Sequence, residues 1–262
     1  MNDSGPSIYN RPNQSDPYSN YENTGANVKT MNMAKIFGYM SLGLLVTGVA
    51  STLFAILFSY LISINPDSIM GIYVGTFFVS IGTLVCTIFA GSLSFTSQRK
   101  PTSHSVAIPF GIYAVLIGYL FGLIFLVCPW EVLAITFGCT AGLFGILALI
   151  GGFAKRNMSM MAYIGSALIG GAFLLSFVNM MLMWFAPEVY MPIYWVISFA
   201  IFAGLMFSTI YDVWQIKTIS AHYENTPNLN LFCAFRLYCD FIALFIRLLY
   251  FILVVYSRNS NN

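Results

Sequence analysis

The sequence predicts an all-α membrane protein, a bundle of seven transmembrane helices with the last helix at its centre. Of the 262 residues, 58% are hydrophobic and only 8% are charged, whereas soluble domains contain about 25% charged residues. The chain has seven apolar stretches, each long enough for the 20 or so helical residues that cross a bilayer. Because a backbone in lipid must satisfy its own hydrogen bonds, these stretches are expected to be helices.

The elements follow in order along the chain. Residues 1–30 are rich in Asn, Ser, Tyr and Pro and are expected to be a disordered tail, because they offer little apolar surface to bury. Residues 31–262 form the membrane domain. Its spans are expected near residues 38–63, 70–95, 106–128, 132–153, 160–185, 191–214 and 230–256.

The connections between the spans predict the orientation. One set contains the basic residues Lys29, Lys35, Arg99, Lys100, Lys155, Arg156 and Lys217. The opposite set contains Asp67, Glu131 and Glu188 and no Lys or Arg. By the positive-inside rule the N-terminus is cytoplasmic, in the plasma membrane of a bacterium or otherwise in an organelle membrane. Arg258 is an exception to this rule, because seven full crossings would place it outside. It leaves open the alternative that the seventh segment enters the membrane without crossing it fully.

Small residues spaced four apart predict close contacts between helices, because they let two backbones approach. The pairs are Gly118 and Gly122, Ser166 and Gly170, and Ala167 and Gly171. The fourth span adds five glycines, at 138, 142, 145, 151 and 152.

Four charged residues lie within the predicted spans: Asp212, Arg236, Asp240 and Arg247. Charges at membrane depth are costly and usually functional. The last three are separated by four and seven residues, so they lie near one face of one helix. At 1.5 Å per residue, Asp212, Arg236 and Asp240 lie about 7, 9 and 15 Å below the cytoplasmic edge.

Two interpretations of these charges remain open. One is a buried ion-pair cluster that pins the sixth helix to the seventh. The other is a titratable site on an ion or proton path, since carboxyl groups in such surroundings can titrate near neutral pH. Arg236 is a candidate bridge between Asp212 and Asp240, which would keep both ionised and tie the sixth helix to the seventh.

The residues around these charges resemble a known family. The stretches IYDVWQI and FRLYCDFIALF resemble the Tyr-Asp and Leu-Tyr-x-Asp-Phe motifs of the Bax-inhibitor family, also called the transmembrane Bax inhibitor motif family. Upstream, YAVLIGYLFGLIF, FGCTAGLFGILALIGGFAKRNMS and LIGGAFLLSFVNMM look like that family's third, fourth and fifth helices. The resemblance covers roughly residues 35 to 256.

The resemblance implies a pH-sensitive calcium leak gated by paired aspartates on the last two helices. Those aspartates correspond here to Asp212 and Asp240, and the motif tyrosines to Tyr211 and Tyr238. In the family, a basic residue late in the second helix is thought to hold the pore closed, and Arg99 is the nearest match.

The chain also departs from the family pattern. The family usually has a small or apolar residue where Arg236 stands, an Asn in place of Ala243, and an Arg in place of Tyr250. Two arginines, Arg236 and Arg247, stand close to Asp240. Their charges imply either that the leak responds to pH over a shifted range or that the site is permanently paired.

Other classes of membrane protein fit these residues less well. By resemblance, an intramembrane aspartyl protease needs Gly-x-Gly before its second aspartate, where this chain has Leu-Tyr-Cys. A metallohydrolase needs several His or carboxylate ligands, and the two histidines, His104 and His222, lie in predicted loops. A retinal protein needs a lysine in the last helix, which has none. We therefore expect that the protein is not an enzyme.

The sequence thus predicts a passive calcium leak under pH control. Asp212 and Asp240 are the expected ion path and pH sensor and form at most a weak calcium site, since hard cations need more oxygen ligands for tight binding. The expected counter-charges are Arg236, Arg247 and Arg99. The expected partners are calcium as the transported ion, protons and the lipid bilayer. No cofactor and no nucleic acid are expected. The alternative is a non-conducting regulator of stress or cell death that binds a membrane protein partner or protease.

Overall fold

The computed structural model describes residues 33–96, 104–155, 157–185, 187–222 and 227–260. They form the helices α1 (Met33–Ile64), α2 (Ser68–Thr96), α3 (His104–Val127), α4 (Trp130–Phe153), α5 (Ser159–Phe185), α6 (Pro187–His222) and α7 (Pro227–Ser260). All seven are long and apolar enough to span a membrane. This confirms the predicted all-α polytopic membrane fold. The predicted tail, residues 1–30, lies outside the described residues.

Several helices extend beyond the predicted spans. The clearest cases are α1 with 32 residues and α6 with 36. Hydropathy detects the stretch that fits the hydrocarbon layer, whereas a helix can continue into the headgroup region because its backbone bonds remain internal. As a result, Asp212 lies well inside α6 instead of next to its predicted end.

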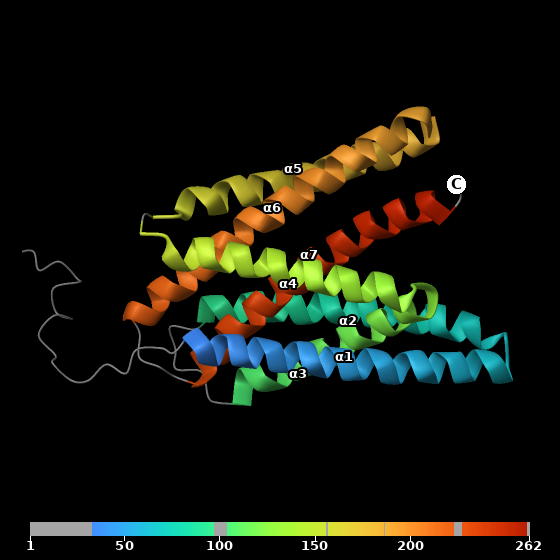
Figure 1. Ribbon diagram of the computed structural model, residues 1–262, viewed down its shortest axis with the longest axis horizontal. Helices are drawn as coiled ribbons and strands as arrows, with labels where there is room; N and C mark the ends of the chain where they lie inside the picture. The colour runs from blue at the N-terminus through green and yellow to red at the C-terminus, as the bar shows by residue number, and fades with distance from the viewer. Residues whose placement is uncertain (1–32, 97–103, 156, 186, 223–226, 261–262) are drawn as a thin grey trace, which may run out of the picture.

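The last helix crosses the whole bundle. Figure 1 shows the C-terminal end of α7 at the opposite end of the molecule from the start of α1. The apolar part of α7, Pro227–Ser257, has 31 residues and a length of about 46 Å at 1.5 Å per residue. That length is sufficient to span a bilayer with its headgroups, which favours a full crossing over a segment that enters without crossing.

The last helix is also central, as predicted. It packs against α1, α3, α4 and α6, and four of its side chains are fully buried, namely Ala234, Leu237, Tyr238 and Leu244. In contrast, α5 packs mainly against α6, and α2 mainly against α3. In Figure 1, α5 lies along one edge of the bundle and α1 along the opposite edge, while α6 runs diagonally from beside α5 across the bundle.

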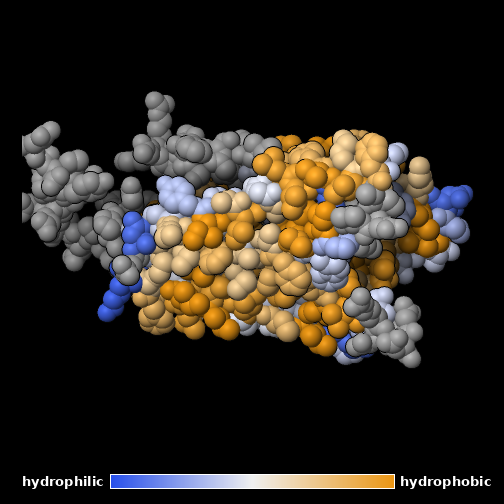
Figure 2. All heavy atoms as spheres, turned by 90° about the horizontal axis from the view of Figure 1, so that it is seen from above, coloured by the Kyte–Doolittle hydropathy of each residue, from blue (hydrophilic) through white to orange (hydrophobic). Residues whose placement is uncertain are grey.

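The outer surface matches a membrane environment. Figure 2 shows hydrophobic side chains over most of the middle of one face, with hydrophilic residues towards its two ends. Side chains that face outward include large apolar residues on every helix, such as Leu45, Phe77 and Phe173. We call the end of the bundle where α1 begins the basic end, because Lys35, Lys155 and Lys217 lie there, and the opposite end the far end.

Only some of the predicted glycine contacts occur. Any side chain at Gly118 or Gly122 would meet α1, with a Cβ at Gly118 only 2.5 Å from Ala50 Cβ, so this pair is confirmed. Gly151 lies equally close to the backbone of α6. Nothing lies within 4 Å of the Cβ position of Gly138, Gly142, Gly145, Gly152, Gly170 or Gly171.

The prediction for those six glycines was therefore wrong. Spacing alone does not say whether a small-residue stripe faces a helix or lipid. The close contact of α5 with α6 uses Gly165 and Gly204 instead, where a Cβ on either residue would lie about 3 Å from the other's carbonyl oxygen.

Candidate functional site

A buried ion pair joins α6 to α7. Asp212 of α6 lies 2.5 Å from Arg236 of α7, measured from Oδ1 to Nη2. The Asp212 side chain is 4% exposed and the Arg236 side chain 34%. Arg236 also donates a hydrogen bond from Nη1 to Gln215 Oε1, at 2.7 Å. Because Gln215 lies three residues after Asp212 on the same helix face, the guanidinium group is held by two α6 side chains.

The second carboxyl group lies against the first. Asp240 follows Arg236 by one helical turn, and its side chain interacts with that of Asp212. Within the described part of the chain, Asp240 Oδ2 is buried with no hydrogen-bond partner. Two carboxyl groups in contact therefore lie near a single guanidinium group, which pairs with Asp212 and acts on Asp240 only through its charge.

Arg236 does not bridge the two aspartates in the way the sequence suggested. Arg236 forms an ion pair with Asp212 and a hydrogen bond to Gln215, while Asp240 lies next to Asp212 itself. Gln215 lies one turn nearer the basic end than Asp212, and its hydrogen bond holds the second guanidinium nitrogen on the side away from Asp240.

The residue before Asp240 connects the acid pair to α3. The Cys239 thiol lies close to both aspartates and to the Tyr113 hydroxyl group. Tyr113 is buried, 8% exposed, and also lies close to Thr87 of α2. Sequence reasoning missed Tyr113 and Gln215. For Gln215, its helical spacing from Asp212 was an available signal; Tyr113 offered none, because its partners come from other helices.

The motif tyrosine Tyr238 is part of a separate buried contact. Its hydroxyl oxygen lies 2.6 Å from Thr47 Oγ1, which is also 3.0 Å from the Gly43 carbonyl oxygen and 3.2 Å from that of Ala114. Carbonyls only accept, so the single Thr47 hydroxyl proton points towards them and Tyr238 donates to Thr47. This contact joins α1, α3 and α7. The other motif tyrosine, Tyr211, is only half-buried, with its ring 5.8 Å from that of Trp214.

Of the two predicted counter-charges that the structure describes, Arg236 and Arg247, only Arg236 contacts the acid pair. Arg247 is half-buried, and no ion pair or hydrogen bond joins it to any residue that the structure describes. Arg99 lies outside the described residues.

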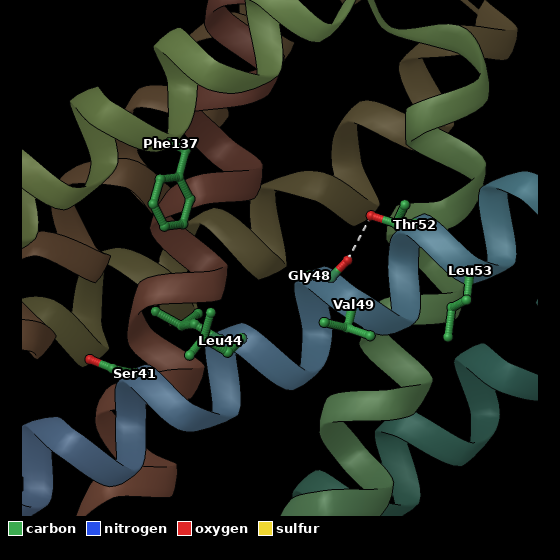
Figure 3. A pocket seen from close by; sticks show the side chains of 8 residues that line it. Ser41, Leu44, Gly48, Val49, Thr52, Leu53 and Phe137 are labelled. Atoms are coloured by element: carbon green, nitrogen blue, oxygen red, sulfur yellow. Dashed lines mark hydrogen bonds between the residues drawn. The ribbon is translucent and has the colours of Figure 1, made fainter.

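The acid pair is separate from a groove on the outer surface. The groove, of about 770 Å³, lies along α1 beside Phe137 of α4 (Figure 3). Its lining is uncharged and consists of Ser41, Leu44, Leu45, Gly48, Val49, Thr52, Leu53 and Phe137. It therefore offers no charged ligand for a cation.

The described residues contain no group of three or more His, Cys, Asp and Glu side chains arranged to hold a metal ion. At the acid pair, a cation would have two carboxyl groups as its anionic ligands. Calcium usually takes six to eight oxygen ligands, so this arrangement suits brief occupation by a hydrated cation better than storage.

The chain has clear relatives. A family model described as "Inhibitor of apoptosis-promoting Bax1" matches residues 30–257. The chain belongs to this family. A similar family member is the inner membrane protein YbhL of Escherichia coli K12, 28% identical over 222 residues that cover 83% of this chain and 88% of the relative.

Two further relatives are similar over comparable lengths. An uncharacterized protein of Borreliella burgdorferi is 29% identical over 244 residues, covering 86% of this chain and 92% of its own. The protein RP147 of Rickettsia prowazekii is 28% identical over 229 residues, covering 84% and 88%. No solved structure matches the chain. This member of the Bax1-inhibitor family is thus a multi-pass integral membrane protein.

Proposed function

We propose that this protein is a passive calcium leak whose activity responds to pH through Asp212 and Asp240. The observation that supports this most directly is the charge imbalance of the buried site. Two carboxyl groups lie near the single guanidinium group of Arg236, so the three groups have a net charge of −1 when both acids are ionised. A proton or a passing cation can neutralise that charge, which links cation occupancy to pH.

The two acids have different tasks in this proposal. Asp212 is held by Arg236 and keeps α6 and α7 together. Asp240 is the group that exchanges protons and cations, because its buried Oδ2 has no donor from the described residues. No covalent step is involved, and we propose that the protein is not an enzyme.

Calcium flux into liposomes that contain the purified protein tests the proposal. We expect flux to depend on pH between about 5 and 8, the range in which a perturbed carboxyl group can titrate. Asp240→Asn should remove either this dependence or the flux. Lys155→Gln, which changes an exposed charge at the basic end, should preserve the parent profile.

A parent protein that passes no calcium, or passes it equally at every pH, would contradict the proposal. That result would favour a non-conducting regulator that binds a membrane protein partner, with the charges as a structural pin between α6 and α7.

A further inference from the structure

Arg247 lies in the contact between α6 and α7, on the far side of the acid pair. On one side of it along α7, Arg236 contacts Asp212 and Gln215 of α6. On the other side, Phe251 contacts three aromatic rings of α6. At 3.6 residues per turn, Arg247 is about three turns after Arg236 and about one turn before Phe251. All three positions share one helix face, so Arg247 also faces α6.

This part of the contact offers Arg247 no negative charge. The opposing stretch of α6, residues 198–211, is SFAIFAGLMFSTIY and contains no acidic residue. Asp240 is about 10 Å away along α7, at 1.5 Å per residue. A guanidinium group is always protonated in proteins. The half-buried Arg247 is therefore a permanent positive charge with no ion-pair or hydrogen-bond partner in the described structure.

Aromatic rings close the contact beyond Arg247. The ring of Phe251 stacks on Trp195 with centroids 6.0 Å apart and on Phe199 at 5.0 Å. Tyr194 and Tyr250 are a further pair, with centroids 5.6 Å apart. From the basic end to the far end, the contact between α6 and α7 thus presents an acid pair, then a positive charge, then packed rings.

We propose that Arg247 is the electrostatic barrier between the acid pair and the far end, and that it limits how fast divalent cations pass. This inference rests on the proposed leak. A cation that leaves the acid pair along α7 towards the far end must pass the guanidinium group. The Coulomb energy of that approach is proportional to the charge of the ion, so it is twice as large for Ca²⁺ as for K⁺.

This proportionality separates a charge barrier from a structural role. If removal of the charge raises K⁺ flux by some factor, it should raise Ca²⁺ flux by about the square of that factor, for example tenfold and a hundredfold. If Arg247 only holds the helices together, its loss loosens the bundle and raises both fluxes by similar factors.

The experiment compares Ca²⁺ and K⁺ flux through liposomes that contain the parent protein, Arg247→Gln, Arg247→Met or Arg247→Lys, all at one pH. Gln and Met both remove the charge but differ in polarity, so if one variant does not fold, the other can still be tested. Thermal unfolding curves show which variants are folded. We expect both neutral variants to raise Ca²⁺ flux more than K⁺ flux. Arg247→Lys, which retains the charge, should keep the parent ratio.

Equal increases for the two ions, or no change in either, would overturn the barrier. In both cases a pH-dependent calcium flux through the parent protein would leave the proposed leak intact. If the parent and all variants pass no ions at any pH, the leak itself is wrong and the barrier fails with it.

Discussion

Replacement of Arg236 by leucine tests the electrostatics of the acid pair. The change removes the ion pair with Asp212 and the hydrogen bond to Gln215, while the leucine side chain fills part of the space. Asp212 and Asp240 then remain in contact without a counter-charge. Two like charges cannot both ionise cheaply in such a site, so one proton should stay bound at higher pH. The midpoint of pH-dependent calcium flux should therefore move upward.

The expected size follows from the usual strength of ion pairs and from the exposure of Arg236. Two unit charges 4 Å apart interact by about 4 kcal/mol at an effective dielectric constant of 20. Because the Arg236 side chain is 34% exposed, water screens part of this energy. A value of about 2 kcal/mol lies between that of exposed pairs and that of fully buried pairs. The midpoint of pH-dependent flux should therefore move upward by an amount that is easy to measure.

The stability lost in Arg236→Leu should also depend on pH. At neutral pH, Arg236→Leu should lower the free energy of unfolding by about 2 kcal/mol, because it leaves uncompensated charge in a buried site. At acid pH, where both carboxyl groups are protonated in either protein, the attraction to Arg236 is absent from the parent too. The difference between variant and parent should therefore shrink as pH falls.

The assay is the flux midpoint of the variant beside that of the parent, with thermal unfolding followed at neutral and acid pH. Arg236→Lys retains the charge and should give a smaller shift. Lys155→Gln removes an exposed positive charge and should move the midpoint little, because exposed charges are screened by salt. If Arg236→Leu and the parent share one midpoint and one stability, the ion pair does not tune the acids.

Three further predictions concern the membrane domain as a whole. On a cysteine-free background, Lys155→Cys should react with an impermeant thiol reagent only from the cytoplasmic side, and labelling from outside intact cells would reverse the orientation. Tyr238→Phe should cost about 1 kcal/mol in thermal or chemical unfolding, since it removes the hydrogen bond to Thr47; an unchanged stability would contradict this. Gly118→Leu should prevent α1 from packing on α3, whereas Gly138→Leu should fold normally, because space is open there; equal expression and stability of the two would count against the packing.

The sequence predicted the structure well where a feature depends only on residues close together in the chain. Apolar stretches determine which segments can enter lipid, so all seven helices could be placed. Counting residues along two helices placed Asp212 and Arg236 at a similar depth in the membrane. The ion pair between them agrees with that prediction. The central position of α7 was less accessible to physical reasoning, and it came from the resemblance to the Bax-inhibitor family.

The remaining features depend on which helix face meets which neighbour. The hydrogen bond of Gln215 to Arg236 and the closeness of Tyr113 to Cys239 each require the rotation of two helices to be known. The same limit explains the glycines, since Gly118 and Gly138 have similar sequence surroundings and yet one meets a helix while the other meets open space. In lipid both faces of a helix are apolar, so hydrophobic periodicity does not separate them.

The distribution of charge along α7 favours an ion path over a structural pin. A pin between α6 and α7 would need only Asp212 and Arg236, which already pair. Asp240 and Arg247 could neutralise each other if they stood four residues apart, where helical neighbours meet. They stand seven apart instead, and the structure shows no ion pair between them among the described residues. Uncompensated charges at membrane depth are costly. An acid pair short of one positive charge, followed about 10 Å further by a positive charge short of a partner, is the arrangement expected of a cation site with a barrier behind it.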